Sequence, residues 1–444
     1  MRISRLAGCV ACALFGVVSL GAAADQITIL TSFPKEITDT YKKAFEKQFP
    51  DSKVEVLNKG TTAAISYLRE LPPGQRPDVF WASAPDAFEV LAAEKLLQAA
   101  PEVANREIPA KIGAYPLNDP EGMYYGQALS GYGIMWNKRY MKAHKLPEPK
   151  EWADLTKPVY FSHVAISSPS RSGTTHLTVE TILQGEGWEA GWAQLLAISG
   201  NCAAITERSY GVPDGVNNGQ FGMGLVIDFF GLSGKYSGFP VEFVYPSVTA
   251  VVPANIGLIA SAKNSEGGKR FIKYSLSKEG QEILLDPKIS RLPVLPSVYG
   301  SRNIPPDFPN VFQIAKKAKV QFDSGLSQSR YAVVSSLFDQ TITFRLKELQ
   351  VAAKAISELE IKLAKKPNAR AAQLLAEAKK TAFTPVLSAQ ESADKELTDL
   401  FKKKKKEVEV TQKVTALEEA WSIKAKANYA KALELALSAE TLMR

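Results

Sequence analysis

The sequence contains little cysteine. Three cysteines occur among 444 residues, and two of them, Cys9 and Cys12, lie within the first 24 residues. Beyond residue 24 only Cys202 remains, and a single cysteine cannot form an internal disulfide. Packing and hydrogen bonding therefore have to stabilise the fold without covalent cross-links.

The residue patterns of common catalytic and metal sites are also missing. Beyond residue 24 there is no G-x-S-x-G, H-E-x-x-H, phosphate-binding loop or C-x-x-C pattern. The three histidines, His144, His163 and His176, are not spaced as metal ligands. His176 lies beside a glycine-containing turn, where it either contacts a ligand, caps a helix or faces solvent. We predict a protein that is not an enzyme and that holds no metal or cofactor.

No apolar run is long enough to span a bilayer comfortably, which takes about 20 residues. The longest run, Leu6 to Leu20, follows two arginines and precedes Gly-Ala-Ala-Ala. A basic, then apolar, then small-residue segment is typical of a secretory signal peptide. We predict that residues 1–24 are such a peptide, cleaved after Ala24, and that the mature protein acts in the periplasm.

Charge is distributed unevenly along the chain. Residues 305–444 contain 24 basic and 17 acidic residues, or +7, whereas residues 25–304 are nearly neutral. The basic tail would suit an anionic membrane surface or an acidic partner, or it is simply a solvated helical surface. Nucleic acid is not an expected partner of an exported protein.

Residues 27–300 alternate short apolar runs with helical patterns, which predicts an α/β fold with a largely parallel sheet. Strands are expected at 27–30, 53–57, 78–81, 133–136, 164–166, 224–227, 242–244 and 257–259. Helices are expected at 36–49, 63–71, 85–97, 174–184 and 189–196.

A proline-rich segment at 304–312 ends this pattern and reads as a linker or a wrapping loop. Beyond it, strong helical periods cover 346–363, 371–382 and 414–443, with Pro367 and Pro385 between them. We predict an antiparallel helical bundle or hairpin appended to the α/β body.

Small hydroxyl residues gather where predicted strands end and helices begin. The longest such stretch is SSPSRSGTTHLT at 167–178, in which Ser172, Thr174 and Thr175 lie at a helix start. A helix start leaves backbone N–H groups free to bind an anion, although Ser or Thr there is also an ordinary cap. The loops at 31–34 and 82–85 follow strands in the same way. Because ligands of open α/β sheets lie beyond the carboxyl ends of strands, these loops predict one polar site for carboxylate or phosphate groups.

These segments, taken in order, resemble a known family. The resemblance lies in the runs ITILTSFPKE, PDVFWAS, GYGIMWNKR, ISSPSRSGTT, MGLVIDFF and GGKRFIKYSLSKEGQEILL before RLPV. They are similar to runs of the bacterial extracellular solute-binding proteins, in the branch that includes periplasmic ferric-iron-binding proteins.

The resemblance implies a type II periplasmic binding protein fold, with two α/β lobes and the ligand in the cleft between them. It places lobe 1 at 25–130 and 248–304 and lobe 2 at 131–247, and it leaves 305–444 as a helical C-terminal extension. It also implies an ABC permease as the membrane partner and hinge closure on binding.

The iron ligands of that branch are absent here. Iron-binding members use a histidine in the first loop, a carboxylate after the third strand and two consecutive tyrosines after the last cleft strand. This sequence has Pro34, Ser83 and the pair Phe229-Phe230 at those positions. A phenyl ring has no oxygen with which to coordinate Fe³⁺.

The anion-binding part of the site is retained. Iron-binding members hold an accompanying phosphate at a Ser-Gly turn, which residues 172–173 match. We therefore predict an anionic, phosphorylated organic ligand, with Asp228 accepting hydrogen bonds from its hydroxyl or amino groups. Arg171, inside the serine-rich loop, is preferred over Arg208 and Arg291 as the charge partner. The predicted ligand-binding residues are Ser32, Phe33, Trp81, Ser83, Arg171, Ser172, Gly173, Thr174, Thr175, Asp228, Phe229 and Phe230.

Several functions remain open at this point. The leading hypothesis is a periplasmic receptor that captures a small phosphorylated metabolite for an ABC importer. The long helical tail resembles the layout of phosphoglycerate transport regulatory proteins, so the second hypothesis is a ligand sensor that reports to a membrane sensor kinase. The third is a ferric-iron-binding protein that holds the metal through exogenous anions. A hydrolase is disfavoured because no catalytic signature is present.

Overall fold

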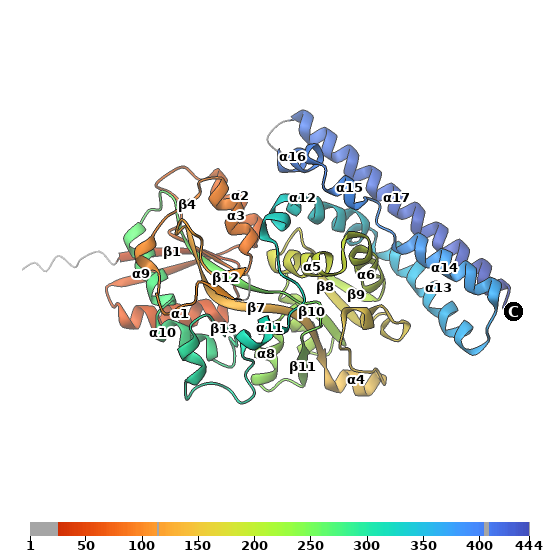
Figure 1. Cartoon of the computed structure of the whole chain (residues 1–444), viewed down its shortest axis with the longest axis horizontal. Helices are drawn as coiled ribbons and strands as arrows, with labels where there is room; N and C mark the ends of the chain where they lie inside the picture. The colour runs from red at the N-terminus through yellow and green to blue at the C-terminus, as the bar shows by residue number, and fades with distance from the viewer. Residues whose placement is uncertain (1–24, 113–114, 404–407, 444) are drawn as a thin grey trace, which may run out of the picture.

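The computed structural model describes residues 25–112, 115–403 and 408–443 (Figure 1). The predicted signal peptide at 1–24 lies outside these residues. The strands are β1 (Asp25–Thr31), β2 (Ser52–Asn58), β3 (Val79–Ala82), β4 (Leu97–Gln98), β5 (Lys111–Ile112), β6 (Tyr115–Pro116), β7 (Tyr124–Asn137), β8 (Val164–Ser167), β9 (Cys202–Thr206), β10 (Met223–Ile227), β11 (Val241–Val244), β12 (Val251–Ile259) and β13 (Leu292–Pro293). The α-helices are α1 (Lys35–Gln48), α2 (Thr61–Glu70), α3 (Pro85–Ala93), α4 (Lys138–His144), α5 (Gly173–Glu186), α6 (Trp188–Gly200), α7 (Gly211–Asn217), α8 (Asp228–Tyr236), α9 (Ser265–Ser275), α10 (Lys278–Glu282), α11 (Val311–Lys317), α12 (Ser324–Thr341), α13 (Leu346–Lys365), α14 (Ala369–Phe383), α15 (Ala389–Ser392), α16 (Lys395–Lys403) and α17 (Val408–Thr441).

The main sheet runs in the order β2-β1-β3-β12-β7-β10-β8-β9. Its outer strands pair in parallel, β1 with β2 and β3, and β8 with β9 and β10. Its middle strands pair antiparallel, because β12 and β7 run back between the two halves. The sheet is therefore mixed, and the prediction of a largely parallel sheet is wrong. An apolar run shows that a strand is buried, but it does not show the strand's direction.

Strand β7 belongs to both halves of the molecule, and all of its residues are buried. Residues 124–131 pair with β12, whereas 132–136 pair with β10. We call lobe 1 the half that contains β1, β2, β3 and β12, and lobe 2 the half that contains β8, β9, β10 and β11. Because β7 runs through both lobes, any rotation of one lobe against the other has to bend this strand.

The C-terminal helices α13, α14 and α17 lie side by side on the far side of lobe 2 (Figure 1). They correspond to the three strong helical periods of the sequence. Helix α13 ends before Pro367 and α14 ends before Pro385, as expected where proline removes a backbone donor. The predicted helical region after the α/β body is therefore present.

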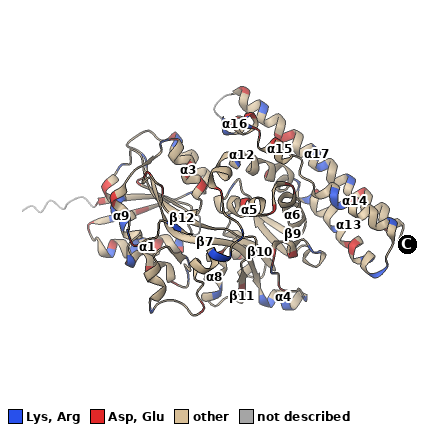
Figure 2. Cartoon of the chain, in the orientation of Figure 1, with Lys and Arg blue, Asp and Glu red and all other residues tan. Residues whose placement is uncertain are grey.

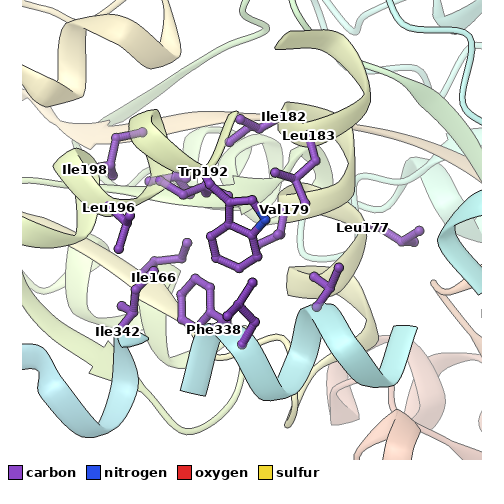
Figure 3. Packing of buried hydrophobic residues seen from close by; sticks show 14 of the residues in the cluster. Ile166, Leu177, Val179, Ile182, Leu183, Trp192, Leu196, Ile198, Phe338 and Ile342 are labelled. Atoms are coloured by element: carbon purple, nitrogen blue, oxygen red, sulfur yellow. The ribbon is translucent and has the colours of Figure 1, made fainter. Parts of the chain in front are cut away.

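Helix α12 joins this region to the core, and the sequence pattern does not predict it. Figure 3 shows Phe338 of α12 facing Trp192 of α6, with Ile342, just after the helix, beside Ile166 of β8, and all four side chains are almost fully buried. The buried face of α12 contains the polar residues Ser327, Arg330 and Thr341, so its apolar stripe is interrupted and hard to recognise in the sequence. The C-terminal region is thus partly built into the α/β body and not merely appended to it.

Acidic and basic side chains are interspersed along the C-terminal helices (Figure 2). Some of them pair between helices, as in the ion pair of Lys379 on α14 with Glu360 on α13, at 2.7 Å. The basic excess of this region is therefore spread over a mixed surface. No helix in the described ranges has both the length and the apolar character needed to cross a membrane.

Candidate ligand-binding site

Six loops meet between the two lobes, and each leads from the carboxyl end of a strand into the start of a helix. Lobe 1 contributes the loops after β1, β2 and β3, and lobe 2 contributes those after β8, β9 and β10. This is the edge at which open α/β sheets bind ligands. We call the space between them the inner pocket. It is lined by Ser32, Phe33, Pro34, Gly60, Thr61, Ser83, Arg171, Ser172, Thr174, Arg208, Ser209, Tyr210, Phe229, Phe230 and Arg291.

The charge of the inner pocket is of one sign. Arg171, Arg208 and Arg291 line it, and no Asp or Glu among the described residues does. The starts of helices α2 and α5 also face it, at Thr61 and Ser172. The first backbone N–H groups of a helix have no partner within the helix and carry partial positive charge. The charges and helix starts that line the pocket therefore favour an anionic group over a cationic one.

Arg291 is the most buried of the three arginines, with 1% of its surface exposed. Its guanidinium carbon lies 3.8 Å from the ring centre of Phe33 and 3.6 Å from that of Phe229, so the group is held between two aromatic rings. Nη1 donates a hydrogen bond of 3.0 Å to Ser83 Oγ. Nη2 is buried and has no hydrogen-bond partner among the described residues.

Burial of the charged Arg291 side chain costs free energy because the guanidinium loses its hydration. Loss of hydration lowers the pKa of Arg291 to about 9, and the nearby Asp228 only partly offsets that effect. The guanidinium still carries its charge at neutral pH. A buried charge with an unused donor is expensive unless a ligand completes its hydrogen bonds. Arg291 is therefore the strongest single indication of a bound anion.

Gly173 is placed where the two lobes touch. A Cβ at this position would lie 2.8 Å from the Cβ of Ala84 and 3.1 Å from Oγ1 of Thr61, both in lobe 1. These distances are shorter than ordinary van der Waals contacts between such atoms. The absent side chain therefore lets the start of α5 approach lobe 1 closely enough to close the pocket.

Eight of the twelve predicted ligand-binding residues line the inner pocket, and four lie behind its lining. Gly173 has the spacing role given above. Trp81 packs among core aromatic rings, and its indole N–H donates to Gln127. The Thr175 N–H donates to the cap residue Ser172. The eight lining residues are Ser32, Phe33, Ser83, Arg171, Ser172, Thr174, Phe229 and Phe230.

Asp228, the fourth, is fully buried and already has its hydrogen bonds. Its carboxylate accepts from the backbone N–H groups of Gly131 and Phe229, both at 2.7 Å, and from the Tyr245 hydroxyl at 3.0 Å. Burial raises the pKa of Asp228 to about 7. The structure gives Asp228 a role in holding β7 against α8, and not the predicted role of accepting hydrogen bonds from ligand groups.

Several lining residues fall outside the predicted set. Gly60 and Thr61 follow β2 just as the predicted loops follow β1 and β3, so the same strand-end rule would have found them. Arg208 follows β9, a strand that the sequence pattern does not reveal. Arg208 and Arg291 are candidate charge partners in the sequence but rank below Arg171, and Arg291 has no local signal because it enters the pocket from a segment far along the chain. Arg171, the preferred arginine, also lines the pocket, but its side chain is exposed.

The inner pocket opens into a larger outer cleft of about 900 Å³, a size typical of small-molecule sites. Arg291, Phe229 and Phe230 line both spaces. The outer cleft adds polar groups and charged groups of both signs, among them Lys35 and Glu36 from lobe 1 and Asp214 from lobe 2. Burial, and then the neighbouring Glu36 carboxylate, raise the pKa of Asp214. A ligand with an anionic head and a polar body matches the two spaces.

The aromatic pair at the boundary provides apolar walls and no metal donors. The rings of Phe229 and Phe230 lie 4.5 Å apart between centres. The described ranges contain no group of three or more His, Cys, Asp or Glu residues arranged to hold a metal ion.

Comparison with known proteins identifies the family. The model of a family described as bacterial extracellular solute-binding protein matches residues 74–310. The phosphoglycerate transport regulatory protein PgtC of Salmonella typhimurium is 30% identical over 355 residues, which cover 79% of this chain and 84% of PgtC. The chain therefore belongs to the bacterial extracellular solute-binding proteins. These are binding proteins, and their extracellular character implies a periplasmic location.

Solved structures of the same kind confirm the fold. The periplasmic binding protein AfuA of Actinobacillus pleuropneumoniae, solved with exogenous fructose-6-phosphate bound, aligns with a TM-score of 0.63 at 19% identity, covering 72% of this chain and 99% of AfuA. Iron-bound HitA of Pseudomonas aeruginosa aligns with a TM-score of 0.56 at 17% identity, covering 70% and 98%. Nearly the whole length of AfuA and of HitA is aligned with this chain, so all of the type II binding protein fold is present here. The C-terminal helical region is additional to that fold.

Proposed function

We propose that this protein is a periplasmic receptor that captures a small phosphorylated metabolite between its lobes and delivers it to an ABC importer. The observation that carries the proposal is the inner pocket, where Arg171, Arg208 and Arg291 converge without an acidic residue among the described lining. Planar guanidinium groups and helix starts together suit the several oxygens of a phosphate group.

The outer cleft supports an organic body attached to that phosphate. A free inorganic anion would need only the inner pocket, whereas the outer cleft offers hydrogen-bonding groups such as Asn58, Asn217 and Ser233. Phosphorylated compounds also appear in the names of two similar proteins, the fructose-6-phosphate of the AfuA structure and the phosphoglycerate of PgtC. These names support the ligand class and leave the individual compound to experiment.

Calorimetric titration and thermal melting of the exported protein test the proposal. The probes are fructose-6-phosphate and 3-phosphoglycerate, with fructose, glycerate and inorganic phosphate as matched controls. At a hundredfold excess over Kd, a ligand should add about 2.7 kcal/mol to the free energy of unfolding. We expect this stabilisation with a phosphorylated probe and not with its unphosphorylated counterpart.

A matched pair of variants assigns the binding to the pocket. Arg208→Met removes a lining charge, and we expect it to weaken binding of the phosphorylated probe at least tenfold. Arg139→Met removes an exposed arginine of lobe 2 outside the pocket, and we expect no change. Equal losses of affinity in both variants would show that the overall charge of the protein determines binding, and would contradict the assignment of binding to the inner pocket.

Ferric salts with and without citrate complete the test, because relatives of this fold bind iron. Stabilisation by ferric citrate alone would favour the iron-binding hypothesis. The phenylalanines at 229 and 230 argue against direct coordination, since neither ring carries a donor atom.

A further inference from the structure

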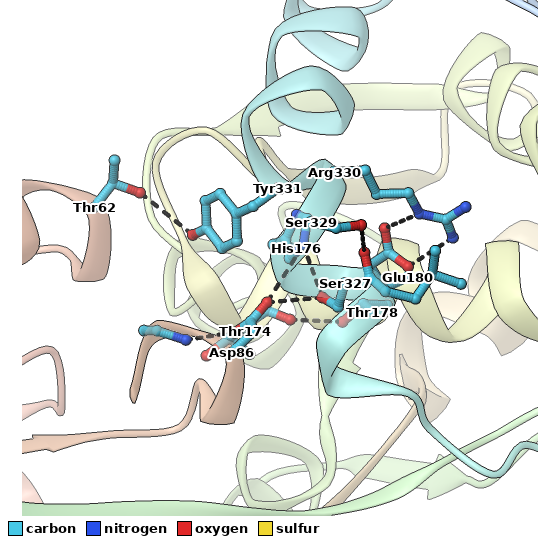
Figure 4. A network of polar contacts seen from close by, with 12 residues as sticks. Thr62, Asp86, Thr174, His176, Thr178, Glu180, Ser327, Ser329, Arg330 and Tyr331 are labelled. Carbon is cyan, nitrogen blue, oxygen red and sulfur yellow. Dashed lines mark hydrogen bonds and ion pairs between the residues drawn. The ribbon is translucent and has the colours of Figure 1, made fainter. Parts of the chain in front are cut away.

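Helix α12 of the C-terminal region is anchored to lobe 2. Arg330 donates two hydrogen bonds, of 2.9 and 2.8 Å, to the carboxylate of Glu180 on α5, and both residues are buried (Figure 4). At the other end of the helix, Phe338 packs into the core of lobe 2 beside Trp192 (Figure 3). A bidentate pair and a buried aromatic ring fix α12 to this lobe.

The same helix also reaches lobe 1. Ser327 Oγ donates a hydrogen bond of 2.8 Å to Oδ2 of Asp86 on α3. One turn along, the Tyr331 hydroxyl lies 3.4 Å from Oγ1 of Thr62 on α2 (Figure 4). Ser327 and Tyr331 lie more than 200 positions after the lobe 1 residues that they contact. From behind the ligand pocket, helix α12 therefore bridges the two lobes.

A histidine of lobe 2 completes the bridge. Nε2 of His176 on α5 lies 3.1 Å from Ser327 Oγ and 3.3 Å from Asp86 Oδ2, and its ring stacks on Tyr331. Burial raises the pKa of Asp86 to about 7 and lowers that of His176 to about 4. Between these values both groups are uncharged, so the contact is a hydrogen bond between neutral groups and not an ion pair. The sequence left three roles open for His176, and the structure places it in this buried network.

This network lies directly behind the residues that line the inner pocket. Asp86 lies three residues after Ser83, in the first turn of α3, and His176 lies four residues after Ser172, in the first turn of α5. A change in the separation of the two lobes at the pocket must therefore change the distances from Asp86 to His176 and Ser327.

We propose that α12 is an interlobe latch that couples occupancy of the ligand pocket to the docking of the C-terminal helices against lobe 1. This inference rests on the proposed function. When the lobes close around a ligand, Ser327 and Tyr331 engage lobe 1. When the lobes open, α12 stays with lobe 2 through Arg330, and the C-terminal helices move away from lobe 1 with it. The position of α17 relative to lobe 1 thus reports the ligand, and by linkage the latch strengthens ligand binding.

The test compares a latch variant with a matched control on the same helix. Ser327→Ala with Tyr331→Phe removes only the two hydroxyl groups that contact lobe 1. Ser329→Ala removes a half-buried hydroxyl whose hydrogen bond, to the carbonyl of Leu326, lies within α12. Spin labels at two exposed positions, Glu70→Cys on α2 and Ala427→Cys on α17, measure the distance from lobe 1 to the C-terminal helices by pulsed electron paramagnetic resonance.

In the parent and control proteins we expect fructose-6-phosphate to increase the population at the short distance. In the latch variant we expect that population to fall and the affinity for the probe to weaken on the order of tenfold, with unchanged circular dichroism. Identical distance distributions and affinities in the parent and latch variant would overturn the proposal.

The two proposals fail in different ways. If calorimetry finds no binding of fructose-6-phosphate, 3-phosphoglycerate or inorganic phosphate, the proposed ligand class is wrong. The latch contacts stabilise the closed arrangement with or without ligand, so they also raise its population in the ligand-free protein. The ligand-free distance distributions then decide the latch by themselves. A longer or broader distribution in the latch variant supports it, and an unchanged distribution refutes it.

Discussion

Replacing Arg291 with methionine should weaken ligand binding and stabilise the ligand-free protein at the same time. Methionine keeps an unbranched chain of similar length between Phe33 and Phe229 and removes the buried charge. In the native pocket that charge has one hydrogen bond, to Ser83, and an unused Nη2 donor. Under the proposed function, this side chain contributes to ligand binding and destabilises the ligand-free protein.

The two effects can be estimated separately. Removing one partner of a buried charge pair costs about 2–5 kcal/mol of binding, so a central value of about 3 kcal/mol corresponds to roughly 150-fold weaker affinity. Replacing a buried, incompletely paired ion with an apolar side chain is often stabilising by about 1–4 kcal/mol. We expect Arg291→Met to raise the melting temperature of the ligand-free protein by a few degrees.

The pH of the assay matters because Asp228 lies near the guanidinium. Its pKa is about 7 in the native protein, and Arg291 contributes to lowering it, so the pKa rises further in the variant. At pH 6 the carboxyl group is mostly protonated and loses little when the arginine is removed. At pH 8 the native carboxylate would lose its positive neighbour, so the stability gain should be smaller there.

Thermal melting at pH 6 and pH 8, with calorimetric titration of the phosphorylated probe, measures both effects. Arg291→Lys is the control, since it keeps the charge but loses the planar group between the rings. A variant that binds the probe with native affinity would refute the site. A variant that binds weakly and is also destabilised at pH 6 would refute the idea that the buried charge is held for the ligand, because the arginine would then be a structural residue.

Three further predictions concern closure, packing and pH. Gly173→Ala should weaken binding of the phosphorylated probe at least tenfold in calorimetry, because its methyl group would lie 2.8 Å from Ala84 in the closed cleft; native affinity would contradict this spacing role. Phe338→Ala should lower the free energy of unfolding in urea by about 3–5 kcal/mol, and a loss below 1 kcal/mol would show that α12 is not part of the core. Asp86→Asn should make stability rise more steeply between pH 4.5 and 6.5. Because the folded protein raises the pKa of Asp86 from 3.8 to about 7, the contribution of Asp86 to the free energy of unfolding falls as pH rises through this range. Because folding lowers the pKa of His176 from 6.5 to about 4, the contribution of His176 rises as pH rises from about 4 to 6.5. The two slopes oppose each other in the native protein, so an unchanged slope in urea titrations of the variant would contradict these pKa directions.

Local patterns were enough to predict much of the fold and part of the site. The alternation of apolar runs and helical periods predicted the α/β body, and the periods at 346–363, 371–382 and 414–443 predicted the long C-terminal helices. Serines and threonines after β1, β3 and β8 marked three of the six loops that line the pocket. Each of these signals depends on residues close together in the sequence.

The features that the sequence did not reveal depend on residues far apart. Arg291 enters the pocket from a segment more than 200 residues beyond the Ser83 that it contacts. Asp228 resembles a ligand acceptor in sequence, but in the fold its Oδ2 accepts from Gly131 N–H and the Tyr245 hydroxyl, and its Oδ1 accepts from Phe229 N–H. Helix α12 buries Ser327 and Arg330 on the same face as its apolar residues, because these two groups have partners on α3 and α5, so the sequence shows no clear apolar stripe there.

The six strand-to-helix loops have a consequence for how proteins of this architecture diversify. In the proposed site, backbone N–H groups at the starts of α2 and α5 act together with the three arginines, and point mutation does not remove a backbone amide. Selection can therefore change the outer cleft, where side chains such as Asn58 and Asn217 line the space for the ligand's body, without dismantling the head-group site. A new specificity can then arise through a series of functional intermediates, each of which still binds anions.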